Sequence, residues 1–517
     1  MISILLNKLR DLSTNQLQSL LVLSGMLIAA QMQYIQHGWI NPDSVLYFES
    51  ARLFTIGEWK QALKVFNWPL YSLLIAGVHK LTTLNIHSSA QLLNVIFFGI
   101  TTASFMKLIS LGGGDKKVML AGALILFSAN YLVGDVLEML MRDPGFWAFF
   151  LTSLLFFIRF YKYGHLNDAL LWQVTAIIAT LFRIEGITYL IFLPLILFFS
   201  IEKKFDVSIR RYIQCNLINL IAVIIILTAV FAMNVISADQ LGRLNEVFTV
   251  NLYDELTHKL FTQSVIMNEL VLGQYLDEFA VQGLLLTFIY ILIAKTISAT
   301  GLVNVGLAVL TLRSKAPMLN EETASVLKFT AVLALFNMGL IITKVFVLSG
   351  RYVLALALIL MIFASYYFAK MFAYLSSRSK ADRKWKWLTI ILIIFMSLSL
   401  IKNMLPKKTG YNYQQEAIAW LRTTNEAKKP VFYDDARARY YANEPFSSQG
   451  SNNWNIVMKA INNNSLNQYH YLVISHSSKH PEREKVLLEK LVNFREINRF
   501  NNSDAKKSVV IYEKNSD

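Results

Sequence analysis

The chain has 517 residues, of which 55% are hydrophobic and only 16% are charged. A soluble globular protein has about a quarter of its residues charged, so this composition excludes a wholly soluble protein and indicates a membrane protein with a soluble part. The net charge of +15 does not indicate nucleic-acid binding, because the excess of Lys and Arg lies in short loops between apolar runs. A single cysteine, Cys215, excludes an internal disulfide.

Apolar runs that can cross a bilayer, at about 20 residues a span, recur through the first 405 residues. The first follows Lys8 and Arg10, and it is longer than the apolar part of a cleaved signal peptide, so we expect it to remain as a span. The eleven predicted spans, several of them short, lie near 17–36, 89–111, 117–134, 146–161, 169–182, 186–201, 213–236, 282–312, 325–347, 351–374 and 387–405.

The segment 68–84 decides the predicted orientation. It contains Pro69, His79 and Lys80 and is predicted to be a helix lying in the outer interface rather than a span. All loops rich in Lys and Arg then share the cytoplasmic side with the N-terminus, as the positive-inside rule requires. These inner loops are 1–16, 112–116, 162–168, 202–212, 313–324 and 375–386.

Three loops are predicted to lie outside the cytoplasmic membrane, facing the periplasm. They are a first outer loop (37–88) built of interfacial helices, a short loop (135–145) and a long loop (237–281) rich in acidic residues. The tail from 406 to 517 also lies outside, and its short β-branched and aromatic runs alternate with helix-like pieces. This pattern predicts a small soluble α/β domain.

Two of the outer acids have open roles. Asp43 follows Pro42 in an Asn-Pro-Asp-Ser sequence, which is typical of a helix N-terminus, and an acid there can simply stabilise the first turn. Asp143 precedes Pro144, which suits a first helical position in the same way. An acid kept beside lipid is also a candidate for function, so both roles stay open at each position.

Further charged residues lie at the predicted outer turns. Arg183 and Glu185 join two short apolar runs, where a local ion pair is the simpler interpretation. Arg351 lies at another outer turn and Lys344 lies within the apolar run before it. An arginine at this depth suits phosphate recognition or anchoring in lipid headgroups. No P-loop, GxGxxG or HExxH motif occurs, and the pair Asp434–Asp435 is predicted to cap a helix.

The order of these motifs resembles the bacterial polytopic glycosyltransferases of the GT-C superfamily. The closest families in that resemblance are the protein O-mannosyltransferases and the lipid A aminoarabinose transferases. The motifs that carry it, over about residues 1–405, are "PDSVLYFESARLFTIGEW", "WPLYSLLIAG", "MRDPGFWAFF", "FRIEGI" and "SGRYVLAL". The resemblance implies an α-helical polytopic membrane protein of about eleven transmembrane helices (1–405) with a small extracytoplasmic α/β domain (406–517).

The resemblance also implies an activity. Such enzymes transfer a sugar from a polyprenyl-phosphate donor to an acceptor hydroxyl on the outer face of the membrane, with inversion. Asp43 would be the catalytic base and Asp143 would orient the acceptor or bind a metal. The donor phosphate would be bound by Arg351, Lys344 and Arg183. The residues expected to contact the acceptor or substrate are Tyr47, Trp68, Tyr71, Glu138, Arg142, Glu185 and Tyr352.

Cofactor and partners are less defined. Met139 stands where an acid is expected four residues before Asp143, so a divalent metal (Mg, Mn or Zn) held by Asp43 and Asp143 is left open. The acceptor is a glycolipid, a polysaccharide or a protein. A flippase for a lipid-linked saccharide, an oligosaccharide ligase and an inactive binding protein of the same fold remain alternatives, although no internal repeat of the transporter kind is evident.

Overall fold

A computed structural model describes residues 12–199, 205–221, 252–273, 275–314, 316, 318–377, 379–406, 412–446 and 453–515. Lys8, Arg10, most of the predicted span 213–236 and the first part of the loop 237–281 lie outside these residues. The chain forms two compact units, which we call the helical unit and the mixed unit. The helical unit contains Met1–Gln33, Ala90–Glu138 and Arg142–Met404, and the mixed unit contains Tyr34–Ser89, Met139–Met141 and Leu405–Asp517.

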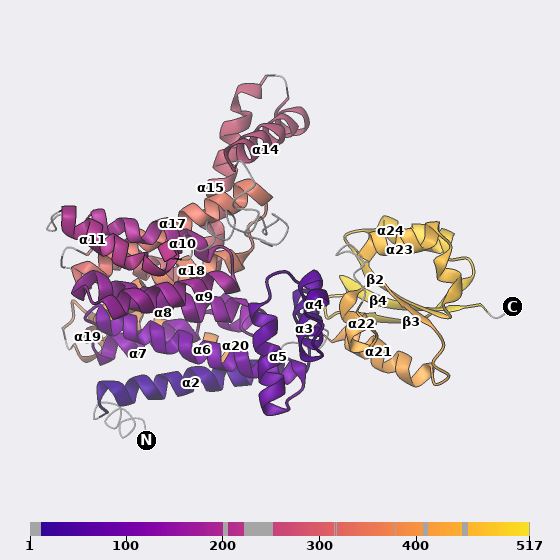
Figure 1. Cartoon of the computed structure of the whole chain (residues 1–517), viewed down its shortest axis with the longest axis horizontal. Coiled ribbons are helices and arrows are strands. Elements are labelled where there is room, and N and C mark those ends of the chain that lie inside the picture. Colours follow the sequence, from indigo (N-terminus) through magenta and orange to yellow (C-terminus); the bar gives the residue numbers. More distant parts are fainter. Residues whose placement is uncertain are drawn as a thin grey trace. The chain divides into compact units, whose positions relative to one another are not determined.

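The helical unit is a bundle of long apolar helices (Figure 1). Its elements up to residue 215 are α2 (Thr14–Ile35), α6 (Ile86–Leu111), α7 (Lys116–Phe127), η1 (Asn130–Val136), α8 (Asp143–Tyr163), α9 (Leu166–Phe182), α10 (Gly186–Phe192), η2 (Leu193–Phe198) and α11 (Phe205–Cys215). After residue 251 come α14 (Leu252–Met267), η4 (Asn268–Leu272), η5 (Asp277–Phe279), α15 (Ala280–Thr300), α16 (Leu302–Leu312), α17 (Glu321–Val345), α18 (Gly350–Met371), α19 (Ala373–Ser376) and α20 (Arg383–Met404).

Among the described residues, seven helices are long and apolar enough to cross a membrane, and the bent pair α7 and η1 makes an eighth if it is one span. Three shorter apolar segments, Leu166–Phe182, Gly186–Phe198 and Leu302–Leu312, account for further predicted runs. The predicted run 282–312 is divided into two helices, because Gly301 adopts a left-handed backbone with φ +88° between α15 and α16.

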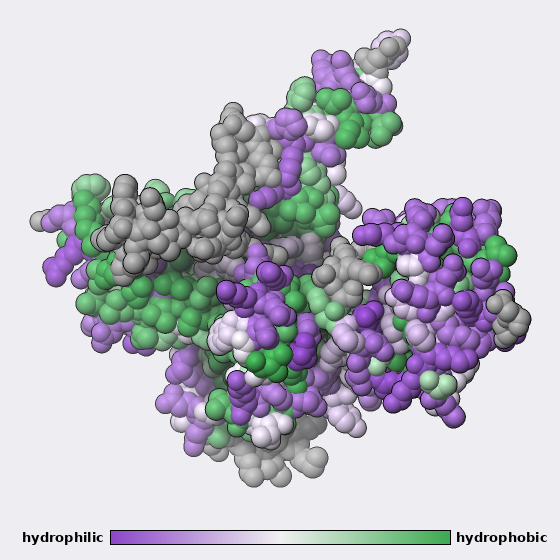
Figure 2. Space-filling model, turned by 45° about the vertical axis from the view of Figure 1, so that its right-hand side comes forward, coloured by the Kyte–Doolittle hydropathy of each residue, from purple (hydrophilic) through white to green (hydrophobic). Residues whose placement is uncertain are grey.

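The surface of the helical unit is apolar over wide areas. Figure 2 shows a broad hydrophobic region over its helices, in contrast to the mostly hydrophilic surface of the part that carries the β-sheet. Exposed large apolar side chains follow one another along α15 and α20, among them Leu286, Ile289, Ile293, Ile391, Phe395 and Leu398. Apolar surface of this extent indicates contact with lipid.

The mixed unit begins with three helices of the predicted first outer loop: α3 (Pro42–Thr55), α4 (Trp59–Val65) and α5 (Leu70–Thr82). The predicted interfacial helix 68–84 corresponds to α5. Its 13 residues extend about 20 Å, which is shorter than the roughly 30 Å hydrocarbon core of a bilayer. The helix buries Ile75 and Ala76 within the unit.

The rest of the mixed unit is the predicted α/β domain. Its elements are α21 (Tyr413–Thr424), β1 (Val431–Tyr433), α22 (Ala436–Tyr441), α23 (Asn453–Asn462), η6 (Ser465–Gln468), β2 (Tyr471–Ser477), α24 (Pro481–Lys490), β3 (Phe494–Asn501) and β4 (Lys507–Lys514). The strand order is β1-β2-β4-β3. β1 and β2 are parallel, and β4 runs antiparallel to both β2 and β3.

Successive side chains along the central strands point to opposite faces of this sheet, so they form two hydrophobic cores, one on each face. On β2, Leu472 and Ile474 join the core with α23 and α24, whereas Tyr471 and Val473 join the core with α21 and α22. Figure 1 shows these two pairs of helices on opposite faces of the sheet. The domain is therefore a three-layer α/β/α sandwich.

Candidate active site

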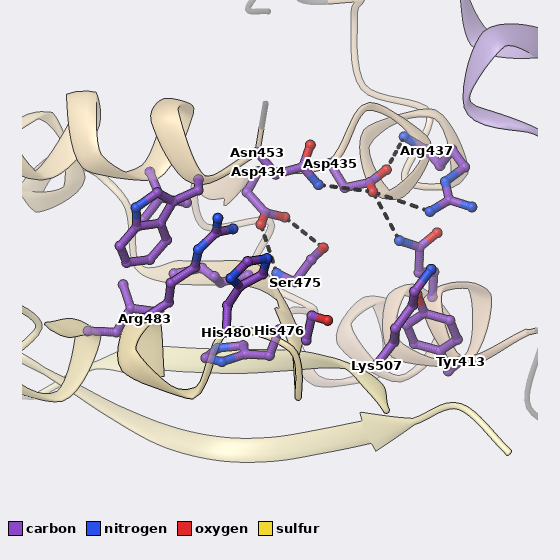
Figure 3. Close-up of a pocket in the computed structure, with 16 residues that line it drawn as sticks. Tyr413, Asp434, Asp435, Arg437, Asn453, Ser475, His476, His480, Arg483 and Lys507 are labelled. Atoms are coloured by element: carbon purple, nitrogen blue, oxygen red, sulfur yellow. Dashed lines mark hydrogen bonds and ion pairs between the residues drawn. The ribbon is translucent and has the colours of Figure 1, made fainter. Parts of the chain in front are cut away.

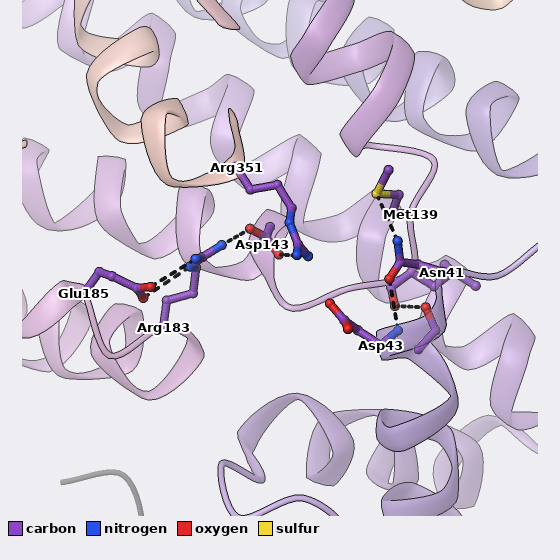
Figure 4. A network of polar contacts seen from close by, with 9 residues as sticks. Asn41, Asp43, Met139, Asp143, Arg183, Glu185 and Arg351 are labelled. Atoms are coloured by element: carbon purple, nitrogen blue, oxygen red, sulfur yellow. Dashed lines mark hydrogen bonds and ion pairs between the residues drawn. The ribbon is translucent and has the colours of Figure 1, made fainter. Parts of the chain in front are cut away.

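Asp43 lies in the first turn of α3, but it is not the capping residue. Asn41 occupies the N-cap and its Oδ1 accepts a hydrogen bond from the backbone N–H of Asp43 at 3.0 Å, while Pro42 takes the first helical position (Figure 4). Ser44 anchors the same turn, because its Oγ donates to the carbonyl of Leu140 at 2.9 Å. The Asp43 side chain is therefore held on a fixed backbone and is only partly buried.

The Asp43 side chain lines a large cavity within the mixed unit, which we call the Asp43 cavity. The cavity encloses about 1180 Å³ between α3, α4 and the α/β domain, which exceeds the roughly 300–1,000 Å³ of sites for drug-sized ligands. Its charged lining residues are Asp43, Glu49, Arg52, Lys64, Asp434, Asp435, Arg439 and Arg483. The wall thus combines four acidic side chains with three arginines and one lysine, a composition suited to a polar ligand.

The α/β domain is joined to α3 by direct contacts. The Tyr441 hydroxyl accepts a hydrogen bond from the backbone N–H of Ile40 at 3.0 Å. The rings of Phe48 and Tyr440 lie with their centroids 5.7 Å apart. The segment just before Asp43 and the next turns of α3 are therefore both fixed against α22.

Three of the aromatic residues expected at the acceptor lie in the interior. Tyr47, Trp68 and Tyr71 are 4%, 5% and 1% exposed. The rings of Tyr47 and Tyr71 meet edge to face at 5.4 Å, so they pack α3 against α5. Their observed contacts support a role in holding α3, while direct contact with an acceptor stays a prediction.

Asp143 lies in the helical unit within a buried ionic network. It is the first residue of α8, is 1% exposed and pairs with Nη1 of Arg183. Its second oxygen lies 4.0 Å from Nη1 of Arg351, at the start of α18. Figure 4 shows the two arginines approaching Asp143 from different helices.

Arg183, at the C-terminal end of α9, is engaged on all sides of its guanidinium. Its Nη2 and Nε donate to the two carboxylate oxygens of Glu185 at 3.1 and 3.3 Å. The guanidinium also lies over the ring of Tyr352, with its carbon 4.5 Å from the ring centroid. The local ion pair expected from the sequence is therefore present. The additional pairing with Asp143 was not predicted.

The other expected site residues are dispersed around this network. Arg142 is the N-cap residue of α8, and Glu138 is 5% exposed. Lys344 lies in the last turn of α17, where its carbonyl accepts a hydrogen bond from Lys259. Glu185 is held in place by Asn337, whose Nδ2 donates to the Glu185 carbonyl at 3.1 Å.

The residues at Asp143 do not fit a divalent metal. Both of its carboxylate oxygens face arginine guanidinium groups, which would repel a cation. Among the residues that the structure describes, no group of three or more His, Cys, Asp or Glu side chains could hold a metal ion.

Sequence reasoning missed most of the Asp43 cavity. Leu46, Glu49 and Leu53 line it because they follow Asp43 at intervals of three or four residues, which places them on one face of α3. This helical periodicity could have predicted that the three residues share a face with Asp43. Arg439 and Arg483 come from the tail, and no local pattern relates them to α3.

The expected fold class, an α-helical membrane protein with a small α/β domain, is confirmed by the membrane-length helices and the four-stranded sheet. In particular, the structure is similar to the crystal structure of ArnT from Cupriavidus metallidurans in the apo state. The TM-score is 0.54 at 11% sequence identity, over 96% of this chain and 97% of that chain. No family model and no curated protein matches the sequence. At 11% identity, this similarity is evidence for a shared fold alone.

Proposed function

We propose that the protein is a membrane glycosyltransferase that moves a sugar from a polyprenyl-phosphate donor to an acceptor hydroxyl. The GT-C fold supports this class of activity. The motifs around Asp43, Asp143 and Arg351, which resemble those of the lipid A aminoarabinose transferases and protein O-mannosyltransferases, support it independently of the fold.

Asp43 is the proposed catalytic base, and its position in the Asp43 cavity is the observation that carries the assignment. The carboxylate is partly exposed to a cavity of about 1180 Å³ and its backbone is fixed by Asn41 and Pro42. A base needs both properties, because it must reach the acceptor and must be held in a defined direction.

The proposed reaction is a single inverting displacement. Asp43 takes the proton of the acceptor hydroxyl as that oxygen forms a bond to the anomeric carbon of the donor sugar. The bond from the anomeric carbon to the phosphate oxygen breaks, and the polyprenyl phosphate leaves with the electron pair. The phosphate is a good leaving group that needs positive charge more than a proton.

Arg351 is the proposed source of that charge. Its side chain is 27% exposed and lies 4.0 Å from Asp143, so its guanidinium can reach a ligand while one carboxylate orients it. Arg183 is already occupied by Asp143 and Glu185, so its proposed role is to position Asp143 rather than to bind phosphate. Lys344 remains a second candidate for the donor phosphate.

The central experiment compares Asp43→Asn with Glu49→Gln. Both residues lie on α3 and line the same cavity, but Glu49 is paired with Arg52. Purified variants would be reconstituted with a polyprenyl-phosphate sugar and fractionated envelope acceptors, and products followed by mass spectrometry. We expect Asp43→Asn to lower transfer by about 100-fold or more, with Glu49→Gln near wild type and both variants unchanged in unfolding temperature.

Two results would contradict this assignment. Near wild-type transfer by Asp43→Asn would remove it as the base. An equal loss in Glu49→Gln would show that the cavity needs charge in general rather than a base at Asp43. Translocation of the lipid-linked sugar without any glycosylated product would favour a flippase.

The proposed site faces the outside of the cytoplasmic membrane, with the N-terminus in the cytoplasm and the α/β domain in the periplasm. Cysteines placed at Lys80 and Lys116, with the buried Cys215 changed to Ser, would test this orientation. A membrane-impermeant maleimide should label position 80 in intact cells and leave position 116 unlabelled. Labelling of position 116 would overturn the orientation while leaving the transfer reaction open.

A further inference from the structure

A second, smaller cavity lies entirely within the α/β domain, and we call it the strand-end cavity. It encloses about 220 Å³ and is found where β1 and β2 end (Figure 3). These two strands are parallel neighbours. Ligands of α/β sheets commonly bind outside the carboxyl ends of parallel strands, because the loops that follow the strands diverge there.

The inner wall of this cavity consists of polar groups arranged by those strand ends. Asp434 directly follows β1, and its two oxygens accept hydrogen bonds from the backbone N–H and the hydroxyl of Ser475 on β2, at 2.8 and 3.0 Å. Asp435 caps α22 and is satisfied by Arg437 and by the amide of Asn453. The wall therefore offers carboxyl, amide and hydroxyl groups that can exchange hydrogen bonds with a hydroxylated ligand.

The two acids differ in charge. Burial, together with the neighbouring Asp435 carboxylate, raises the pKa of Asp434 to about 8. For Asp435, burial opposes ionisation, but the charge and hydrogen bonds of Arg437 lower its pKa below the ordinary value. Asp434 is thus largely protonated near neutral pH, and the Asp435 charge is neutralised by Arg437.

The remaining cations give the cavity a net positive charge. Arg483 on α24 and Lys507 at the start of β4 both line it. Within the part of the chain that the structure describes, neither forms an ion pair, and Arg483 packs over the ring of Trp454 at 5.3 Å. Figure 3 shows Arg483 and Lys507 on different sides of the cavity, with Asp434 and Ser475 between them.

We propose that the strand-end cavity binds a monosaccharide-sized group that carries a carboxylate or a phosphate. Arg483 and Lys507 hold the anionic group, and Asp434 and Asn453 hydrogen-bond the sugar hydroxyls. The volume is below the roughly 300–1,000 Å³ of drug-sized sites, which limits the occupant to about one sugar residue. The site does not include Asp43, although the two cavities share five wall residues: Asp434, Asp435, Asn453, Trp454 and Arg483.

Binding to the purified full-length protein in detergent would test this proposal without any sugar donor. Galacturonate and glucose 1-phosphate would be titrated by calorimetry, alongside glucose and inorganic phosphate. We expect both anionic sugars to bind at least tenfold more tightly than glucose or phosphate, because only they engage both walls of the cavity. The ligand could be a lipid headgroup or a free sugar, and a glycolipid that carries the same phosphorylated sugar, presented in nanodiscs, distinguishes the two. Tighter binding of the glycolipid than of the free sugar phosphate would identify a lipid headgroup as the ligand. Equal binding of the two would identify a free sugar.

Lys506, the chain neighbour of Lys507, provides a matched control for these substitutions. Lys507→Ala and Arg483→Ala should each weaken binding by about tenfold or more, as expected for loss of a charge-assisted hydrogen bond. Lys506→Ala should leave binding unchanged, because Lys506 pairs with Asp504 and does not line this cavity. Unchanged unfolding temperatures would verify that the variants fold.

Three outcomes would overturn the proposal. They are the absence of binding by either anionic sugar, equal effects of Lys507→Ala and Lys506→Ala, and binding of inorganic phosphate as tightly as the sugar phosphate. Because no transfer is measured, none of these outcomes bears on the proposed glycosyltransferase reaction.

Discussion

The contrast between Arg183 and Arg351 gives the sharpest test of the site in the helical unit. Arg183 is 4% exposed and lies between two carboxylates, Asp143 and Glu185. Changing Arg183 to Ala removes the cation that pairs with both acids and leaves Asp143 only the longer contact with Arg351. Removal of one partner from a buried ion pair costs about 3–5 kcal/mol. Arg351→Ala removes a longer contact of 4.0 Å made by a side chain that is 27% exposed, so it should cost less stability than Arg183→Ala.

The two variants should therefore show opposite patterns. Unfolding in one detergent, followed by tryptophan fluorescence, should show a large loss of stability for Arg183→Ala and little change for Arg351→Ala. Donor-dependent transfer should be lost in Arg351→Ala although the protein remains folded. A double variant that also carries Asp143→Asn should lose less from the Arg183 change than the single variant does. Equal stabilities of Arg183→Ala and Arg351→Ala would refute the reasoning.

Three further predictions concern local structure. Because Asp434 retains its proton in the folded state up to about pH 8, its contribution to the stability of the α/β domain should be complete below about pH 4 and be lost as the pH rises to about 8, a change of up to about 5 kcal/mol. Asp434→Asn should remove this component, so unfolding curves measured from about pH 4 to about pH 8 should show a smaller loss of stability in the variant than in the wild type. Gly145→Ala should cost about 1–3 kcal/mol because its Cβ would meet the Phe182 ring, whereas Gly339→Ala, with open space around it, should leave the unfolding midpoint equal or slightly raised. Asn41→Ala should lower the free energy of unfolding by about 1 kcal/mol because the N-cap of α3 is lost, and it should also lower the transfer rate. An unchanged transfer rate would show that this cap is not needed to position Asp43.

Much of the fold followed from local patterns in the sequence. Apolar runs predicted the long helices, and β-branched runs predicted β1, β2 and β4. β3 (Phe494–Asn501) was missed because most of its side chains are polar and partly exposed at the edge of the sheet. Its pairing with β4 supplies the strand conformation, and that is a tertiary effect no local pattern contains.

The candidate sites were predictable only in part, for the same reason. The sequence indicated that Asp435 would cap a helix, and it does so through the N–H of Arg437. It gave no sign that the preceding Asp434 bonds to Ser475 on another strand, 41 residues away. Pairing of Arg183 with Asp143 likewise spans 40 residues. Contacts at such separations depend on how the elements pack, which residue spacing does not determine.

The surroundings of Asp43 and Asp143 favour different roles for these two acids. Asp143 is buried, and both of its carboxylate oxygens face arginine guanidinium groups rather than an open cavity. Asp43 is partly exposed and lines a cavity large enough for a substrate. A general base must take a proton from a ligand that enters and leaves, so of the two carboxylates Asp43 fits that role, and Asp143 fits the role of orienting Arg351. If Asp143 acts through Arg351, Asp143→Asn should chiefly raise the KM for the donor, whereas Asp43→Asn should chiefly lower kcat. If both acids were bases, the two variants would instead lower the transfer rate equally.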